Sequence, residues 1–355
     1  MKIKRVFADF HHASLLHSLI MLFEDRLGYE LYRPIGMDWA TQGYWKVYNH
    51  PATQEQFLGI GGATPDGTPP LNDVAGVTEN QDSVIYHCQD IDSGMTNKAI
   101  TLDGFMSMDF DIVIASLPHH IEPFKRLCEA HPSKPKLIFQ IGNAWTIEAG
   151  LAPNIMASAI IHDVPSDINF ISYHQEFDTS LFVQGDIKPE KAIYSFVNCF
   201  NIEPHFSQDW QLFTKIEKNM PDWEFKAFGG QCRDGAAHGV KQVAEFMQKA
   251  MFVWHTKAGG DGYGHILHNA ACMGKPMIAN VGYYNGKMGE VLLKDGETCI
   301  AIDNLDIGQI MSKIEHYSQP DEYTALCEKT KNNFAQNVDF EAEAERIRLF
   351  LNNLT

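Results

Sequence analysis

Residues 261–278, DGYGHILHNAACMGKPMI, decide the fold that this sequence predicts. The apolar run 251–254 lies in front of them and is typical of a strand, and the glycine-rich residues 255–264 are typical of a turn. Residues 266–273 are apolar or small and run into Gly-Lys-Pro, which predicts a helix and its end. A further apolar run follows at 277–281. Strand, turn, helix and strand predict a βαβ unit, and such a unit belongs to a parallel sheet.

The turn of such a unit is a favourable place for an anion. It lies at the carboxyl edge of the sheet, where the first N–H groups of the helix point outward with the positive end of the helix dipole behind them. Phosphate is the commonest occupant of a site of this kind. The sequence therefore predicts an anion site at residues 261–264.

The order of residues in this stretch resembles the donor-site signature of retaining, GT-B-type glycosyltransferases. That signature contains an acidic residue, Gly-aromatic-Gly, a helix with a second Glu, a small-residue segment and Gly-Lys-Pro. Asp261 stands at the first acidic position, Gly262-Tyr263-Gly264 match the turn, and Gly274-Lys275-Pro276 match the end of the helix. Residues 290–298 loosely resemble the tail of the pattern, with an extra residue before Gly296.

The chain departs from the signature at both acidic positions. Asp261 is shorter than the Glu of the family, and Asn269 replaces the second Glu. In the family the first carboxylate lies near the sugar and the second bonds the ribose hydroxyls. An Asn can still bond a ribose diol, because it has a carbonyl acceptor and an amide donor.

The resemblance implies a site for a nucleotide-diphospho-sugar. Gly264 and the backbone N–H groups of His265 and Ile266 would face the diphosphate. Asn269 would face the ribose, and Asp261 would act near the sugar in catalysis. A purely structural turn is the alternative interpretation of the same residues.

Family members usually also carry an Arg and a Lys after the first strand of the C-terminal domain, which neutralise the leaving diphosphate. Residues 198–205, NCFNIEPH, contain neither. The charge that develops on a leaving diphosphate requires cations or hydrogen-bond donors. Three other cations are candidates for this role: Lys257, Arg233 and Lys287.

Two histidine pairs are candidates for the acceptor side of the site. His11 and His12 follow the first expected strand, where related inverting enzymes place a catalytic base. His119 and His120 follow a later strand, at the turn where retaining members often place a sugar-contacting histidine. Imidazole suits both tasks, because its pKa lies near working pH. The chain holds 16 histidines, so several of them are bystanders.

The histidines also raise the question of a metal site. His265 and His268 are spaced for one helix face, but no acidic partner accompanies them as in H-E-x-x-H. GT-B enzymes generally need no bound metal for their chemistry. We therefore expect no metal and no cofactor, with the nucleotide-diphospho-sugar as a co-substrate.

Composition limits the class of protein. With 355 residues and 45% hydrophobic content, the chain is long enough for about two domains. A net charge of -17 argues against a surface for generic nucleic-acid binding. The 7 cysteines are scattered and form no C-x-x-C pair, which indicates reduced thiols in a cytoplasmic protein. Neither a signal peptide nor a transmembrane segment is expected.

The order of elements predicts an α/β protein of two doubly wound, Rossmann-like domains facing a cleft. We expect strands at residues 3–10, 30–34, 111–116, 137–141, 157–161, 168–174, 192–197, 224–228, 251–254 and 277–281. Helices are expected at 14–27, 121–130, 208–219, 240–250, 266–273, 306–317, 321–333 and 340–354.

The domains are predicted from these elements. Residues 1–182 form an N-terminal, acceptor-side domain, with an irregular insertion at about 36–104. Residues 190–338 form the C-terminal, nucleotide-sugar domain, and 339–355 form a helix that packs back on the N-terminal domain. The aromatic residues between Trp39 and Tyr48 are typical of a stacking platform or of a local core.

The predicted function is transfer of a sugar from a nucleotide-diphospho-sugar to an acceptor hydroxyl, with retention of configuration. A sugar-nucleotide epimerase or a phosphorylase on the same architecture is one alternative. A non-catalytic protein that binds sugar-nucleotides or glycans is another, suggested by the altered acidic pair and the absent Arg and Lys. The acceptor stays open among a glycan, a lipid-linked sugar, a small molecule, a protein and a modified nucleobase.

Overall fold

The structure is a computed structural model that describes residues 4–8, 13–34, 85–89, 95–100, 102–116, 118–142, 152–159, 164, 166–185, 189–237 and 239–354. The chain divides into two compact units. The first unit comprises Met1–Phe177 and Phe340–Thr355, and the second comprises Asp178–Asp339. The predicted aromatic group between Trp39 and Tyr48 lies outside the described residues.

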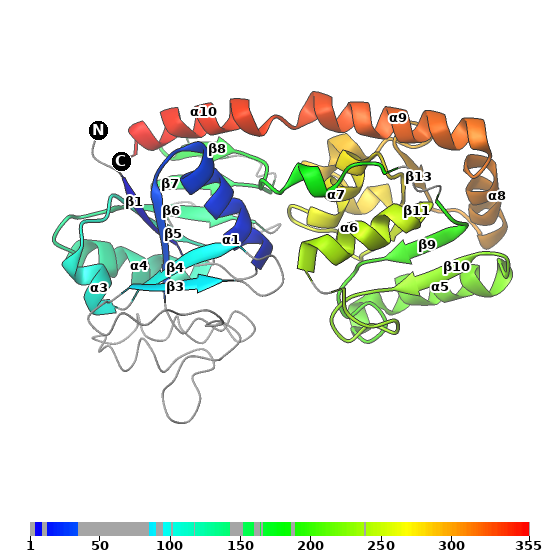
Figure 1. Ribbon diagram of the computed structural model, residues 1–355, viewed down its shortest axis with the longest axis horizontal. Helices are drawn as coiled ribbons and strands as arrows, with labels where there is room; N and C mark the ends of the chain where they lie inside the picture. Colours follow the sequence, from blue (N-terminus) through cyan, green and yellow to red (C-terminus); the bar gives the residue numbers. More distant parts are fainter. Residues whose placement is uncertain are drawn as a thin grey trace. The chain divides into compact units, whose positions relative to one another are not determined.

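The first unit contains a sheet with the strand order β3-β4-β2-β1-β5-β6-β7-β8 (Figure 1). Its strands are β1 (Arg5–Ala8), β2 (Glu30–Pro34), β3 (Ile85–Gln89), β4 (Thr96–Ile100), β5 (Ile112–Ala115), β6 (Lys136–Ile141), β7 (Asn154–Ala157) and β8 (Asn169–Ser172). All neighbouring pairs are parallel except β3 and β4. The order of the strands reverses between β1 and β5, so the topological switch point of this sheet lies there.

Apolar side chains explain why these strands lie inside the unit. Every residue of β5 and β7 is buried, as expected for parallel strands that are covered on both faces. Phe7 on β1 packs against Phe105 of α3 (Leu102–Ser107), with ring centroids 4.7 Å apart. It also packs against Phe124 of α4 (Pro118–Ala130), at 6.0 Å. These contacts place the core of the first unit around the middle of its sheet.

The first helix differs from its prediction. It begins as α1 (Ala13–Ile20), but Met21–Arg26 form a π-helix, in which Leu27 N–H donates to Leu22 O at 3.0 Å. Two side chains of this π-helix form ion pairs: Glu24 with Lys98 and Arg26 with Glu176, both at 2.7 Å. A period of 3.6 residues does not reveal such a change in the sequence.

The C-terminal helix α10 (Phe340–Asn352) belongs to the first unit (Figure 1). Its apolar face joins the core of that unit through Ala344, Ile347, Phe350 and Leu351. Its carboxylates form polar contacts as well. Glu343 accepts from the backbone N–H of His174 at 2.7 Å and from its Nδ1–H at 2.6 Å, and Glu341 pairs with Arg26.

The second unit contains a parallel sheet with the order β10-β9-β11-β12-β13. Its strands are β9 (Ala192–Ser195), β10 (Glu224–Ala227), β11 (Phe252–His255), β12 (Met277–Ala279) and β13 (Cys299–Ala301). Its longer helices are α5 (Ser207–Asn219), α6 (Gly239–Lys249), α7 (His265–Met273), α8 (Ile307–Tyr317) and α9 (Pro320–Asn337). Helix α5 packs with α8, while α7 packs with α6 and α9, so helices cover both faces. The strand order reverses between β9 and β11.

The Gly-Lys-Pro segment ends α7 as predicted and has a second structural role. Gly274 is in the left-handed conformation at the end of the helix, with φ 72°. The Lys275 side chain is only 4% exposed, and its Nζ donates to Ala250 O at 2.6 Å and to Gln248 O at 3.3 Å. Burial lowers the pKa of Lys275 to about 8. A buried ammonium group thus binds carbonyl groups at the C-terminal end of α6.

The predicted fold class is confirmed: the protein is α/β, with two mostly parallel sheets and flanking helices. The strand predicted at 157–161 was wrong in position, because β7 is Asn154–Ala157. The polar Asn154 is tolerated inside the sheet because its side-chain amide donates to Leu137 O at 3.0 Å. The sequence did not predict β3, β4 or β13; β3 and β4 lie within the predicted irregular insertion.

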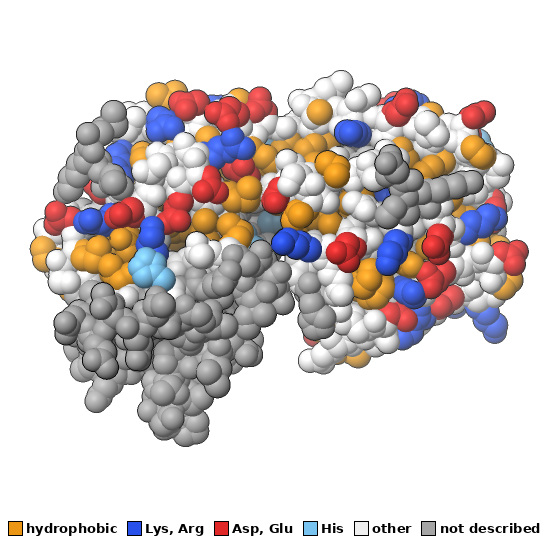
Figure 2. Space-filling view, viewed as in Figure 1, with side chains coloured by type: hydrophobic (Ala, Val, Ile, Leu, Met, Phe, Trp, Pro, Cys, Tyr) orange, Lys and Arg blue, Asp and Glu red, His pale blue; other side chains and the backbone are white. Residues whose placement is uncertain are grey.

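Charges of both signs are interspersed on one face of the second unit (Figure 2). On the face drawn in Figure 2, the Lys and Arg side chains of the second unit lie among Asp and Glu side chains instead of forming a basic patch. Among the described residues, no helix is long and apolar enough to cross a membrane.

Candidate functional site

The turn between β11 and α7 lies at the carboxyl end of β11, beside the switch point between β9 and β11. Ligands of open α/β sheets bind at such points. Gly264 precedes the helix in the left-handed conformation, with φ 78° and ψ 67°. Because glycine has no side chain, Gly264 provides no side-chain cap, and a ligand can approach the N–H groups at the start of α7 closely.

The loop after β12 approaches this turn closely. At Gly260, with φ +65°, an added Cβ would lie 2.4 Å from Tyr283 O and 2.6 Å from Lys287 Nζ. Lys287 Nζ donates to Gly259 O. A side chain at residue 260 would collide with this loop. The close approach of the two backbones therefore requires a glycine there.

Both oxygens of Asp261 are engaged by neighbouring side chains. Oδ1 pairs with Lys257, and Oδ2 accepts from His255 Nε2–H at 2.7 Å and from Tyr284 O–H at 3.3 Å. Burial alone would raise the pKa of the Asp261 carboxyl, but the hydrogen bonds and charges of His255 and Lys257 hold it well below its usual range. The group is therefore a carboxylate at any working pH.

The remaining signature residues surround the start of α7. The Tyr263 ring stacks on the ring of His268, with centroids 4.0 Å apart, and lies edge-on to His265 at 4.9 Å. His268 Nδ1–H donates to Gly264 O at 2.9 Å, which ties the helix to the turn. Ile266 is partly exposed in the first turn of the helix.

Asn269 follows on the next turn of α7 and is only 5% exposed. Its Oδ1 has no hydrogen-bond partner in the described part of the chain. An acceptor in this condition is unusual in a folded protein. It is available to a hydroxyl group of a ligand that reaches the residue.

The structure separates the three candidate cations. Lys257 and Lys287 both contact residues of the turn, as described above. Arg233 lies after β10, and its guanidinium group binds Glu217 at 2.7 Å, Asp234 at 3.0 Å and Phe225 O at 2.8 Å. None of these partners belongs to the turn.

Three residues beside the turn were missed by the sequence analysis. Two of them, His255 and Tyr284, contact Asp261. The third residue is Asp209, in the first turn of α5. The Asp209 carboxyl accepts from the backbone N–H of Ala258, and its pKa is raised by burial. Asp209 is an ordinary first-turn acid in the sequence, and no local pattern distinguishes it.

The predicted residues of the first unit can be placed only in part. His11 and His12 lie outside the described residues, between the end of β1 and the start of α1. His119 and His120 lie in the first turn of α4, directly after β5, and their side chains are not described. Because β1 and β5 are neighbours at the switch point of the first sheet, both predicted pairs follow strands at a position typical of ligand binding.

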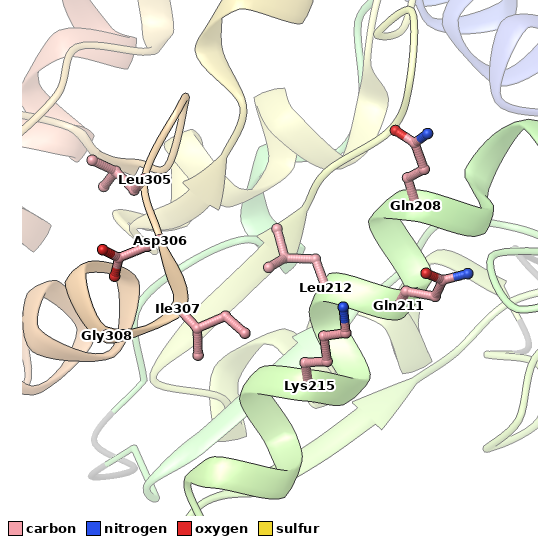
Figure 3. A pocket seen from close by; sticks show the side chains of 8 residues that line it. All are labelled: Gln208, Gln211, Leu212, Lys215, Leu305, Asp306, Ile307 and Gly308. Atoms are coloured by element: carbon pink, nitrogen blue, oxygen red, sulfur yellow. The ribbon is translucent and has the colours of Figure 1, made fainter.

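A groove of about 610 Å³ lies elsewhere in the second unit, between α5 and the start of α8. Figure 3 shows Gln208, Gln211 and Lys215 projecting from α5 on one side, with the segment Leu305–Gly308 on the other. Asp306 caps α8 by accepting from Gln309 N–H at 2.9 Å. The residues of this groove are separate from the turn.

Comparison with solved structures identifies the architecture. HepE of Anabaena, solved with UDP and glucose, superposes with a TM-score of 0.62 at 10% identity, covering 99% of this chain and 100% of HepE. The chain has the GT-B fold. The pneumococcal O-GlcNAc transferase GtfA, solved with UDP and GlcNAc, shares this GT-B fold with a TM-score of 0.58 at 10% identity, covering 99% of each chain.

TarM of S. aureus, another GT-B structure, matches with a TM-score of 0.52 at 11% identity, over 76% of this chain and 64% of TarM. No protein-family model matches the sequence, and no curated protein does. The GT-B resemblance inferred from residues 261–278 is therefore confirmed by the fold and not by overall sequence similarity.

Proposed function

We propose that the protein is a glycosyltransferase that uses a nucleotide-diphospho-sugar bound at the turn between β11 and α7. The observation that carries this proposal is the left-handed Gly264 at the start of α7, beside the switch point of a GT-B sheet. HepE and GtfA, which have this fold, are solved with UDP. The ordered signature at 261–278 supports the same position for a donor.

The diphosphate would bind the N–H groups at the start of α7, contributed by His265 and Ile266. The ribose would bind Asn269, whose Oδ1 is buried and has no partner among the described residues. A ribose hydroxyl that donates to this oxygen would supply the absent hydrogen bond. The donor would thus contact the turn and the first two turns of one helix.

The acceptor would belong to the first unit. The histidine pairs at 11–12 and 119–120 follow β1 and β5 at its switch point. In the transfer, the bond from the anomeric carbon to the diphosphate oxygen breaks, and a bond to the acceptor oxygen forms. An imidazole can accept the hydroxyl proton or orient the hydroxyl. We infer retention of configuration and independence of metal from the resemblance of the donor turn.

The partners follow from the same argument. The donor is a nucleotide-sugar, and the acceptor carries a hydroxyl in one of the classes left open by the sequence. A net charge of -17 argues against generic nucleic-acid binding. The six cysteines that the structure describes as free thiols are consistent with a cytoplasmic location.

Thermal unfolding with UDP, GDP, ADP, CMP and TDP tests the proposed donor site. A nucleotide that binds only the folded protein raises its melting temperature by mass action. The variant Gly264→Ala should weaken this shift, because an L-residue is strained at φ +78°. Gly28→Ala is the matched control: Gly28 is also left-handed, at φ +68°, but lies in the first unit.

Two results would contradict the proposal. One is the absence of any shift at millimolar nucleotide, and the other is an equal loss of the shift in both glycine variants. A nucleotide that passes this test selects the sugar-nucleotide for an acceptor screen. Acceptor-dependent release of the nucleoside diphosphate would then demonstrate transfer.

A second candidate function is sugar-nucleotide binding without transfer. It is favoured by one observation: the oxygens of Asp261, at the sugar-side position, are both engaged by His255, Lys257 and Tyr284. Binding of a sugar-nucleotide without turnover, across a broad acceptor panel, would support this candidate over the transferase.

A further inference from the structure

Two lysines from different loops reach the same turn. Lys257 comes from the loop after β11 and pairs with Asp261 Oδ1. Lys287 comes from the loop after β12 and donates to the carbonyl oxygen of Gly259. The two ammonium groups thus contact residues that are two positions apart in the turn, directly before Gly264 and α7.

The position of Lys287 is fixed by its surroundings. Its Nζ lies so close to the backbone that an added Cβ at Gly260 would be 2.6 Å away. The same Nζ lies 5.9 Å from the centroid of the Tyr284 ring, whose hydroxyl donates to Asp261. The backbone N–H of Lys287 donates to Tyr284 O at 2.9 Å. The ammonium group is therefore held beside the turn by several contacts.

Charges of both signs meet at the turn. Lys257 and Lys287 reach it together with two carboxyl groups, that of Asp261 and that of Asp209, which accepts from the N–H of Ala258. The N-terminus of α7 adds the positive end of a helix dipole. Burial lowers the pKa of Lys287; the charge of Asp261 raises it by a smaller amount, and the neighbouring charge of Lys257 lowers it again. In a chain with a net charge of -17, such an arrangement at one turn is consistent with an anion that completes it.

We propose that Lys257 and Lys287 bind the diphosphate of the donor, and that they select nucleoside diphosphate sugars over nucleoside monophosphate sugars. The inference rests on the proposed function. Lysine binds phosphate as a point charge, and two ammonium groups from two loops suit two linked phosphates better than one. The other candidate cation, Arg233, is bound to Glu217, Asp234 and a backbone carbonyl.

The same lysines would act on the leaving group. When the bond between the anomeric carbon and the terminal phosphate oxygen breaks, its electron pair stays on that oxygen and negative charge accumulates on the diphosphate. Fixed cations beside the phosphates stabilise this charge more than the charge of the intact donor. Loss of either lysine should therefore lower the rate of transfer as well as the affinity.

Calorimetric titration of the wild type, Lys257→Gln and Lys287→Gln tests the proposal. Each protein is titrated with UDP, GDP and ADP and with the three corresponding monophosphates. For the base that the wild type binds, the ratio of diphosphate to monophosphate affinity should fall about tenfold in each variant, because a hydrogen bond to a charged group is lost. This ratio does not depend on the fraction of a variant that is folded, since both ligands meet the same sample.

The matched control is Lys294→Gln. Lys294 follows the same loop, but its Nζ donates to Asn333 Oδ1 at 3.2 Å on helix α9. This variant should keep the ratio of the wild type. An unchanged ratio in Lys257→Gln or in Lys287→Gln, or a similar fall in the control, would overturn the lysine pair while the donor site stands. If the wild type binds none of the three diphosphates, the proposed function itself fails.

Discussion

Nε2 of His255, the last residue of strand β11, lies 2.7 Å from Oδ2 of Asp261 in the turn before helix α7. A carboxylate can only accept, so His255 carries its proton on Nε2. The hydrogen bond joins the end of the strand to the turn six residues later. The backbone of the proposed donor site is thus fixed by protein contacts before a ligand arrives.

Replacement of Asp261 should destabilise the second unit. In Asp261→Asn, one amide group would face two donors, from His255 and Lys257, and the negative charge between them would be lost. We expect a loss of about 3 kcal/mol in the free energy of unfolding, as for other buried ion pairs with one partner removed. Urea unfolding followed by tryptophan fluorescence measures it.

Glu122→Gln serves as the control for this change. Glu122 pairs with Arg126 on α4, and both side chains are more than half exposed. Its replacement should change the free energy of unfolding by about 0.5 kcal/mol or less. Equal effects of the two substitutions would show that the Asp261 cluster does not stabilise the turn.

The Asp261 cluster should also appear in the acid unfolding of the protein. The folded-state pKa of this carboxyl is lowered from its ordinary value of 3.8. The stability that it contributes is therefore complete above the unfolded-state pKa and is lost as the pH falls below it. The difference in unfolding free energy between wild type and Asp261→Asn should be constant from pH 7 to about 5 and should shrink below about 4. A difference that grows on acidification would contradict the assignment.

Gly260 and its neighbour Gly259 provide a matched pair. Both are left-handed, with φ +65° and φ +79°, but an added Cβ meets Tyr283 O at 2.4 Å only at residue 260. Gly259→Ala should cost about 1 kcal/mol of stability, from backbone strain alone. Gly260→Ala should cost at least about 2 kcal/mol more, because the loop after β12 must move. Thermal unfolding of both variants compares them, and equal costs would mean that the two loops do not touch at Gly260.

Lys275 should make the protein more stable at alkaline pH. Burial lowers its folded-state pKa to about 8, from an ordinary value of 10.5. The unfolded chain therefore binds more protons between these values, and stability rises with pH across this window. The wild type should gain about 2 kcal/mol relative to Lys275→Met between pH 8 and pH 10. A flat difference over this range, measured by urea unfolding, would show that Lys275 titrates normally.

Glu343 should matter more than another glutamate on the same helix. Glu343 is 7% exposed and accepts from His174 twice, whereas the side chain of Glu345 is 64% exposed and pairs with Arg348. Glu343→Ala should cost about 2 kcal/mol, because the backbone N–H and the ring N–H of His174 both lose the Glu343 carboxylate as an acceptor. Glu345→Ala should change stability by about 0.5 kcal/mol or less. Limited proteolysis near α10 should follow the same order, and similar rates would contradict the role of Glu343.

Local patterns in the sequence predicted the longer helices and the central strands, but not α3, which begins within the predicted insertion. The Gly-Lys-Pro segment marked the end of α7, and apolar runs marked strands such as β9 and β11, in which every residue is buried. Strand β13, Cys-Ile-Ala, is too short to show a period. Strand β12 is equally short, but its place directly after the Gly-Lys-Pro segment located it. Strands β3 and β4 contain polar residues that do not resemble an apolar run.

The candidate site could be predicted only where its residues are close together in the sequence. Residues 261–269 form one turn and one helix, so a linear pattern locates them. Tyr284 contacts Asp261 from 23 positions away, and Lys287 reaches Gly259 from 28 positions away. Such contacts depend on how two loops pack at the edge of the sheet. No local pattern contains that information.

The position of helix α10 has a consequence for the order of folding during synthesis. The first unit consists of Met1–Phe177 and Phe340–Thr355, and α10 completes its core with Ile347 and Phe350. The ribosome produces the whole of the second unit before this helix exists. During translation the second unit can therefore fold from a contiguous segment, while the first unit must wait with part of its apolar surface uncovered.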